Sequence, residues 1–183
     1  MNMLKWFLAL ILIVVAGWFI LRSNNRMNMA ERELDIAIAG LERVFDKKYE
    51  LCGNVVITFK THSDVRAAAV EKLERTRMQA MNLSFTEATT TRKGPSKFSA
   101  IQNILNKELS TLADSIHAND TLSADANFGV LFDELGQNKP LERGMIKNYN
   151  AKIGDYNAVI RKFPNSVLNN LFGYKKRYKL EME

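Results

Sequence analysis

Apolar residues follow two different patterns along this chain, one continuous and one periodic. Sixteen successive residues without a charge run from Trp6 to Leu21. Met3 and Leu4 extend this stretch across Lys5 to roughly the 20 residues that span a bilayer. From Ala30 onward, apolar residues instead recur three and four positions apart, as in an amphipathic helix. The two patterns predict a transmembrane helix over residues 4–21, a short linker over 22–29, and a helical domain over 30–173.

A cleaved signal peptide is the alternative reading of the N-terminal stretch. Met1–Lys5 is a short positive segment, and Val14–Ala16 offers a small-residue cleavage site. The apolar run continues beyond that site through Trp18 to Leu21, so a cleaved product would begin with apolar residues. We therefore favour an uncleaved single-pass anchor.

The charges that flank the span bear on its orientation. Arg22, Arg26 and Arg32 follow it, whereas Lys5 precedes it. By the positive-inside rule this places the following domain in the cytoplasm, although a short charged tail can also insert in the opposite direction.

A heptad pattern predicts the first helix of the domain, from about Ala30 to Phe59. Its apolar seam alternates in steps of four and three, broken by one lysine, as in coiled coils. This phase includes the β-branched patch Val55–Phe59, which we accordingly assign to helix. The seam consists of Leu34, Ile38, Leu41, Phe45, Lys48, Cys52, Val55 and Phe59.

Shorter amphipathic patterns predict the remaining helices. One runs from a cap at Ser63 to about Met81, with the face Val65, Ala69, Leu73, Thr76, Ala80 and Leu83. Residues 86–96 are polar and include Gly94-Pro95, which indicates an exposed loop. A third helix is expected from a cap at Ser96 or Ser99 to about residue 117.

A last helical region is expected from Ser123 or Asp125 to Pro164. Gly136, Pro140 and Gly144 lie within nine positions of it, and an internal proline removes one helical hydrogen bond, so we expect an interruption there. The basic tail over residues 174–183 is expected to be loosely held. The fold class predicted is therefore all-α, an antiparallel bundle of three to four long helices behind one N-terminal transmembrane helix.

Composition narrows the chemistry available to the chain. The net charge is +6 and the single cysteine, Cys52, excludes an intrachain disulfide. His62 and His117 stand alone, without the spacing of a metal site or a local catalytic triad. We therefore predict no catalytic residues, no cofactor and no metal. Nucleic acid is not expected as a partner, because no basic stripe with interleaved aromatic residues is present.

One set of motifs is similar to a known family. The motifs are Asn127-Phe128, Leu131, Glu134-Leu135, Tyr149-Asn150, Tyr156-Asn157, Phe163-Pro164 and Phe172-Gly173. In this order and spacing they resemble the C-terminal half of LemA proteins, and Lys47–Val56 resembles a segment of their first half. The chain departs from the family at Asn138–Pro140, where the family has an unbroken helix, and at Ile146, where it has arginine. The resemblance implies a membrane-anchored helical bundle of the bacterial inner membrane and supplies no activity.

The two Tyr-Asn pairs lie seven residues apart, on one helical face. We interpret Tyr149, Asn150, Tyr156 and Asn157 as a structural network between helices, with Asn54 as their partner from the first helix. The alternative is a polar cavity for a small ligand.

We therefore expect a non-enzymatic interaction or scaffold module at the membrane, with an unknown protein partner or a second copy of itself. The alternative function is a small-molecule sensor or enzyme that uses the Tyr/Asn-lined cavity. A further idea is contact with anionic lipid. The cations considered for that contact are Arg92, Lys93, Lys97, Lys175, Lys176, Arg177 and Lys179.

Overall fold

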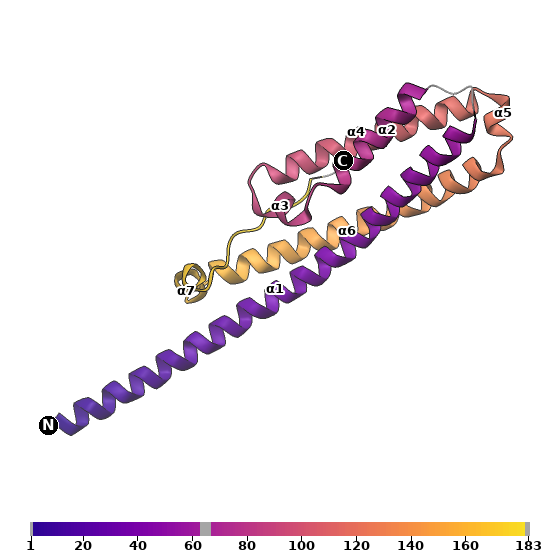
Figure 1. Ribbon diagram of the computed structural model, residues 1–183. Helices are drawn as coiled ribbons and strands as arrows, with labels where there is room; N and C mark the ends of the chain where they lie inside the picture. The colour runs from indigo at the N-terminus through magenta and orange to yellow at the C-terminus, as the bar shows by residue number, and fades with distance from the viewer. Residues whose placement is uncertain (1, 63–66, 182–183) are drawn as a thin grey trace.

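The computed structural model describes residues 2–62 and 67–181, and throughout these ranges the regular structure is helical, with no strand. The helices are α1 (Asn2–Thr61), α2 (Ala67–Met81), α3 (Phe85–Thr90), α4 (Gly94–His117), α5 (Asp120–Ser123), α6 (Ala126–Arg161) and α7 (Asn165–Phe172). The long helices alternate in direction along the bundle, and α1 packs along α6 while α2 packs on α1 and α4 (Figure 1). The predicted all-α antiparallel bundle is confirmed.

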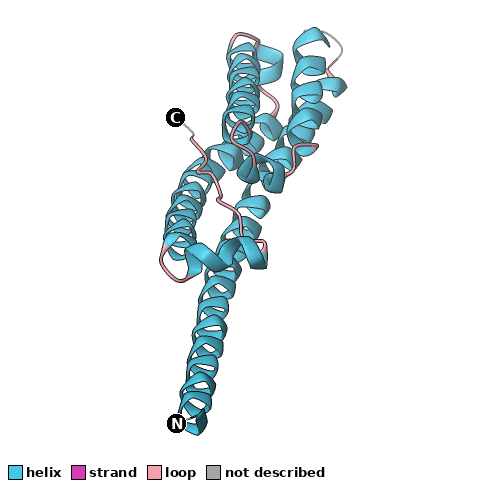
Figure 2. Cartoon of the chain, turned by 90° about the vertical axis from the view of Figure 1, so that its left-hand side faces the viewer, coloured by secondary structure: helices cyan, strands magenta, loops and turns pink. Residues whose placement is uncertain are grey.

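α1 is one unbroken helix of 60 residues, which projects from the bundle at its N-terminal end (Figure 2). The linker expected over residues 22–29 is therefore wrong, because this segment is helical. It contains neither glycine nor proline, and Ser23 and Met27 are buried against the rest of the chain. The helix thus carries the apolar stretch directly into the packed domain.

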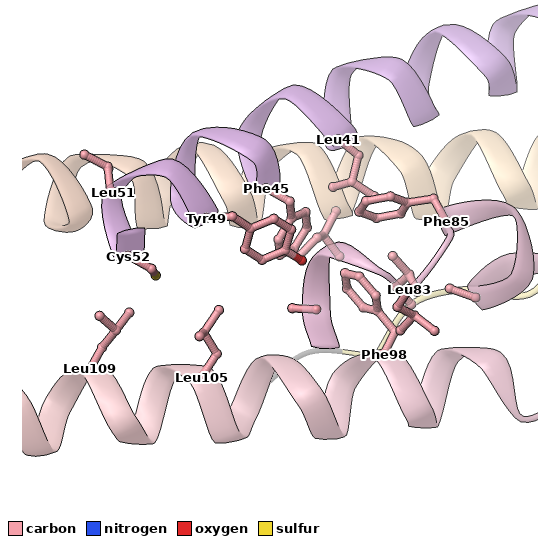
Figure 3. Packing of buried hydrophobic residues seen from close by; sticks show 14 of the residues in the cluster. Leu41, Phe45, Tyr49, Leu51, Cys52, Leu83, Phe85, Phe98, Leu105 and Leu109 are labelled. Carbon is pink, nitrogen blue, oxygen red and sulfur yellow. The ribbon is translucent and has the colours of Figure 1, made fainter. Parts of the chain in front are cut away.

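The heptad seam of α1 forms one wall of the core. Seven of its eight residues are buried, and Ile38 packs partly buried against the same cluster. The β-branched patch at residues 55–59 is helical, as the heptad phase predicted. In Figure 3, Phe45 of α1 meets Phe85 and Phe98 from α3 and α4, and its ring centroid lies 5.1 Å from that of Phe98.

The predicted face of α2 is confirmed from Leu73 onward. Leu73, Thr76, Ala80 and Leu83 are buried, and Ala69 is partly buried. The expected cap at Ser63 and the apolar residue Val65 lie outside the described residues.

The loop expected over residues 86–96 is helical except at residues 91–93, so its predicted backbone conformation is wrong, although residues 86, 87, 91–93 and 96 are exposed as expected. α3 occupies its first half, and Ala88, Thr89, Gly94 and Pro95 are buried. A Cβ at Gly94 would lie 2.5 Å from the carbonyl oxygens of residues 87 and 88, so this close turn requires glycine. α4 therefore begins at Gly94 rather than at Ser96 or Ser99, with Pro95 in its first turn, where a missing amide costs no hydrogen bond.

α6 runs without a break from Ala126 to Arg161, so the interruption expected at residues 136–144 is also wrong. The helix starts next to Asp125, one of the two predicted starts, and the Asp125 carboxylate caps it by accepting a hydrogen bond from the Asn127 amide. Pro140 and Gly136 are both exposed, so water can solvate the carbonyl that Pro140 leaves without a helical partner. The neighbours Asn138 and Glu142 are buried and keep this stretch packed on the bundle.

A short helix that the sequence analysis missed follows Pro164. α7 ends at Gly173, whose φ of 81° lies in the left-handed region that glycine adopts without strain. The turn sends residues 174–181 back along α6 as an extended segment (Figure 1). This segment is not loosely held as expected, because Tyr174 and Leu180 are buried.

Candidate functional site

The Tyr-Asn face of α6 binds the C-terminal segment, which we define as residues 174–181. The Asn157 side chain donates to the carbonyl of Arg177 at 2.8 Å and accepts from its amide at 3.1 Å. Asn150 makes the same pair of bonds with Leu180, at 2.7 and 2.9 Å. Each amide side chain therefore replaces a neighbouring strand for one residue of the segment.

The spacing of the two asparagines matches that of their targets. Seven residues of α-helix rise about 10.5 Å, at about 1.5 Å per residue. Three residues of extended chain, from Arg177 to Leu180, cover about 10 Å. A Tyr-Asn repeat of seven can therefore hold an extended segment at every third residue, whatever the side chains of that segment are.

The two tyrosines of the motif fill the core beneath the segment. Tyr149 and Tyr156 are buried, and the Tyr156 hydroxyl donates to the carbonyl of Lys175 at 3.0 Å. Burial raises the pKa of Tyr149 to about 12 and also raises the pKa of Tyr156. Neutral, buried hydroxyls of this kind hold the segment in place.

α3 holds the segment from its other side. The amide of Tyr178 donates to the carbonyl of Thr89 at 2.8 Å, and the Ser99 hydroxyl donates to the carbonyl of Glu181. The segment therefore closes the gap between α6 and the α3–α4 turn.

Asn54 does not belong to this network, so the predicted partnership is wrong. It is exposed on α1, and its carbonyl accepts a bond from Thr58 one turn later. The seam residues beside it, Cys52 and Val55, occupy the buried face instead. The partner of Asn150 and Asn157 is the backbone of the C-terminal segment, which side-chain pairing rules could not reveal.

A buried polar cluster lies at the one position where a charge breaks the heptad seam. The Lys48 ammonium lies 3.0 Å from a carboxylate oxygen of Glu142 and donates to Gln102 at 3.2 Å. The Gln102 amide in turn donates to the Tyr49 hydroxyl, and burial raises the pKa of that phenol. The charged side chains are only 5% and 8% exposed, so this cluster joins α1, α4 and α6 through a paired internal charge. Sequence reasoning missed Gln102 and Glu142, although Lys48 on an apolar seam was a signal that a buried acid existed.

An open groove of about 1060 Å³ separates α4 from α6 beside this cluster. One wall carries Lys139, Arg143 and Lys147, four residues apart on α6 and therefore on one helical face. None of the three forms an ion pair with a described residue. The opposite wall, from α4, is polar and includes Ser96 and Asn103.

The cations considered for lipid contact fall into two groups. Lys175, Lys176 and Lys179 are exposed on the C-terminal segment, while Arg177 lies 3.9 Å from Glu31 of α1. Arg92, Lys93 and Lys97 are exposed at or just after the α3–α4 turn. Of the seven, Lys97 and Arg177 each lie near a carboxylate, at 3.5 Å from Glu87 and 3.9 Å from Glu31.

The surroundings of Cys52, His62 and His117 indicate structural roles for Cys52 and His62 and an exposed position for His117. Burial raises the pKa of the Cys52 thiol to about 12. His62 lies 2.9 Å from Asp125 and joins the end of α1 to the start of α6, and this contact lowers the pKa of the Asp125 carboxyl. His117 is exposed at the end of α4. Among the residues that the structure describes, no group of three or more His, Cys, Asp or Glu side chains is arranged to hold a metal ion.

These features define a class of protein. One helix long and apolar enough to cross a membrane, by length and composition, continues into a bundle closed by a clamped C-terminal segment. Such an arrangement fits a membrane-associated helical protein. The family model described as the LemA family matches residues 37–183, and the chain belongs to that family. A search of the curated proteins found no match.

Proposed function

We propose that this protein is a non-enzymatic interaction module anchored in the bacterial inner membrane, with its bundle in the cytoplasm. The observation that carries the proposal is the continuity of α1. Its apolar N-terminal part has exposed side chains, whereas its C-terminal part is a wall of the core. A bundle joined to its anchor without a flexible linker holds its surfaces at a fixed height above the membrane, as a scaffold for a protein partner requires.

Membrane extraction tests the anchor. The full-length protein is expected to stay with membranes washed at alkaline pH and to dissolve only in detergent. Leu12→Arg with Val15→Arg places two charges in the span, each costing about 2.5–3.5 kcal/mol on insertion scales, and is expected to release the protein. The matched control, Ile57→Arg with Val130→Arg, adds the same charges at exposed positions of the bundle and should stay in the membrane. Release of the parent by the alkaline wash would contradict the anchor.

Labelling of a single exposed cysteine tests the orientation. Cys52 is buried, so the parent serves as the unlabelled control. Val130→Cys, in contrast, is exposed on the bundle. A membrane-impermeant maleimide is expected to label it only after the cells are opened. Labelling in intact spheroplasts would place the bundle outside the cytoplasm.

The α4–α6 groove favours a second candidate function, the binding of a small anionic molecule. Like charges at Lys139, Arg143 and Lys147 repel one another, and an anion between them would relieve that repulsion. The Tyr-Asn face is a poorer candidate, because the C-terminal segment covers it. Citrate should raise the melting temperature of the parent and leave that of Arg143→Glu unchanged. Equal melting curves with and without citrate and inorganic phosphate would count against this function.

A further inference from the structure

α7 presents large apolar side chains to solvent, which is unusual for a short helix at the end of a domain. Val167 is 66% exposed and Leu171 is 75% exposed, and the two lie four residues apart on one face. Phe163, in the turn before α7, is 82% exposed. The opposite face is packed, because Asn165 is buried and Leu168 lies against the core. α7 is therefore firmly seated on the bundle, with its outer apolar face uncovered.

The position of α7 along α1 is fixed by specific contacts. The Ser23 hydroxyl of α1 donates to the Asn165 side chain at the start of α7. Just beyond α7, the Tyr174 hydroxyl reaches the side chains of Asn24 and Asn28. Ser23 follows Leu21, the last residue of the apolar stretch, by two positions, or about 3 Å of helix rise. α7 thus lies at the level where the apolar part of α1 ends.

The direction of α7 suits a membrane surface. Figure 1 looks nearly down the axis of α7 while α1 runs lengthwise across the picture, and Figure 2 shows α7 crossing beside an upright α1. α7 therefore runs across the direction of α1 rather than along it. If α1 crosses a bilayer, α7 lies close to the plane of that bilayer.

Exposed cations flank α7 on both sides in the sequence. Arg161 and Lys162 precede α7, and Lys175 and Lys176 follow it. Arg22 of α1 stands one residue before the Ser23 contact, with its guanidinium 5.2 Å from the Trp18 ring. An apolar face flanked by cations is the composition of helices that lie in the headgroup region of anionic membranes.

We propose that α7, together with Phe163, is an interfacial helix whose apolar face inserts into the headgroup–acyl boundary of the same bilayer that α1 crosses. This inference rests on the proposed membrane anchor. It gives the bundle a second point of attachment, so that α1 and α7 together fix its tilt. The bound surface is an anionic lipid bilayer, because α7 lies at the level where the apolar part of α1 ends and is flanked in the sequence by cations.

Depth-dependent fluorescence quenching tests this placement in the full-length protein. A bimane label is attached at Leu171→Cys in a Cys52→Ala background. The labelled protein is then reconstituted in bilayers of phosphatidylethanolamine and phosphatidylglycerol. The quencher is a lipid with a nitroxide high on its acyl chain. Val14→Cys, inside the apolar stretch, is the positive control, and Val130→Cys, exposed at the far end of the bundle, is the negative control. Val167→Cys repeats the measurement should Leu171→Cys melt below the parent.

The inference predicts that labels at Leu171 and Val14 are both quenched by the lipid nitroxide while the label at Val130 is not. Quenching at Val14 without quenching at Leu171 or Val167 would overturn the interfacial helix and leave the anchor standing. Absence of quenching at Val14 as well would overturn the anchor and, with it, this inference. A blue-shifted label at Leu171 that no lipid nitroxide quenches would show that protein, such as a second copy, covers the face, and would also overturn the inference.

Discussion

The two ends of α1 are both rich in large apolar residues and have opposite surroundings. Residues 6–21 are apolar on every side of the helix, and nearly all of their side chains are exposed. Residues 34–59 are apolar along one stripe, and that stripe is buried. The difference shows how the arrangement of apolar residues around a helix decides what solvates it. An all-round apolar surface is suited to lipid, whereas a stripe is suited to a few neighbouring helices.

Truncation of matched phenylalanines should separate the two ends most strongly. Phe45 is fully buried against Phe85 and Phe98, so Phe45→Ala should lower the free energy of unfolding of the bundle by about 3–5 kcal/mol. Phe19→Ala, in the exposed apolar end, should leave it within about 0.5 kcal/mol of the parent. Denaturant unfolding of the full-length protein in mild detergent measures both. Equal losses in the free energy of unfolding for Phe45→Ala and Phe19→Ala would contradict the difference in surroundings between the two ends of α1.

The buried ion pair should be nearly as important as the aromatic core. Lys48→Met leaves the Glu142 carboxylate buried without its partner, which should cost about 3 kcal/mol. Replacing both residues, as Lys48→Met with Glu142→Leu, should recover most of that loss because no unpaired charge remains. The same unfolding assay decides between these outcomes. If the double variant is as unstable as the single one, the loss of stability in Lys48→Met does not come from the unpaired Glu142 carboxylate.

Loss of an asparagine that clamps the C-terminal segment should have a smaller effect. Asn157→Ala removes two hydrogen bonds to Arg177 and should cost about 1–3 kcal/mol. Asn54→Ala is the matched control and should stay within about 0.5 kcal/mol of the parent, because its side chain is exposed. Amide exchange at Arg177 and Leu180 should accelerate in Asn157→Ala alone. Unchanged exchange there would mean that the segment is held by other contacts.

The effect that is smallest near neutral pH, and grows only under alkaline conditions, is that of the Cys52 thiol. The folded-state pKa of Cys52 is about 12, raised by burial from an ordinary value of 9.0. Below pH 9 the thiol is neutral in both states, and above it only the unfolded thiol ionises, so stability falls as pH rises from 9 towards 12. The parent should lose stability faster over this range than Cys52→Ala, as read from chemical melts. Parallel pH profiles would place the thiol in contact with water.

Periodicity and spacing explain why most of the fold was predictable. The heptad of α1 and the face of α2 depend on local spacing, which helical geometry fixes. The errors have a common cause, since the α3 turn, the unbroken α6 and the bound C-terminal segment all depend on contacts between distant parts of the chain. Gly94-Pro95 by itself indicates a loop. The neighbouring helix α3 is held by a distant contact that local sequence does not show, because the Thr89 carbonyl accepts a hydrogen bond from the amide of Tyr178. Likewise, the Tyr-Asn repeat marked the right face of α6, while its partner was a backbone with no recognisable side-chain pattern.

The central claim is that α1 joins an apolar anchor to the bundle core as one rigid helix, and a distance measurement tests it directly. Spin labels at Leu21→Cys and Arg43→Cys, both exposed, are separated by 22 positions (43 minus 21), or about 33 Å of helix rise. In lipid nanodiscs, with Cys52→Ala, pulsed electron–electron double resonance should give one narrow distribution near that distance. A broad distribution, or one centred well below it, would show a flexible joint at residues 22–29 and contradict the account.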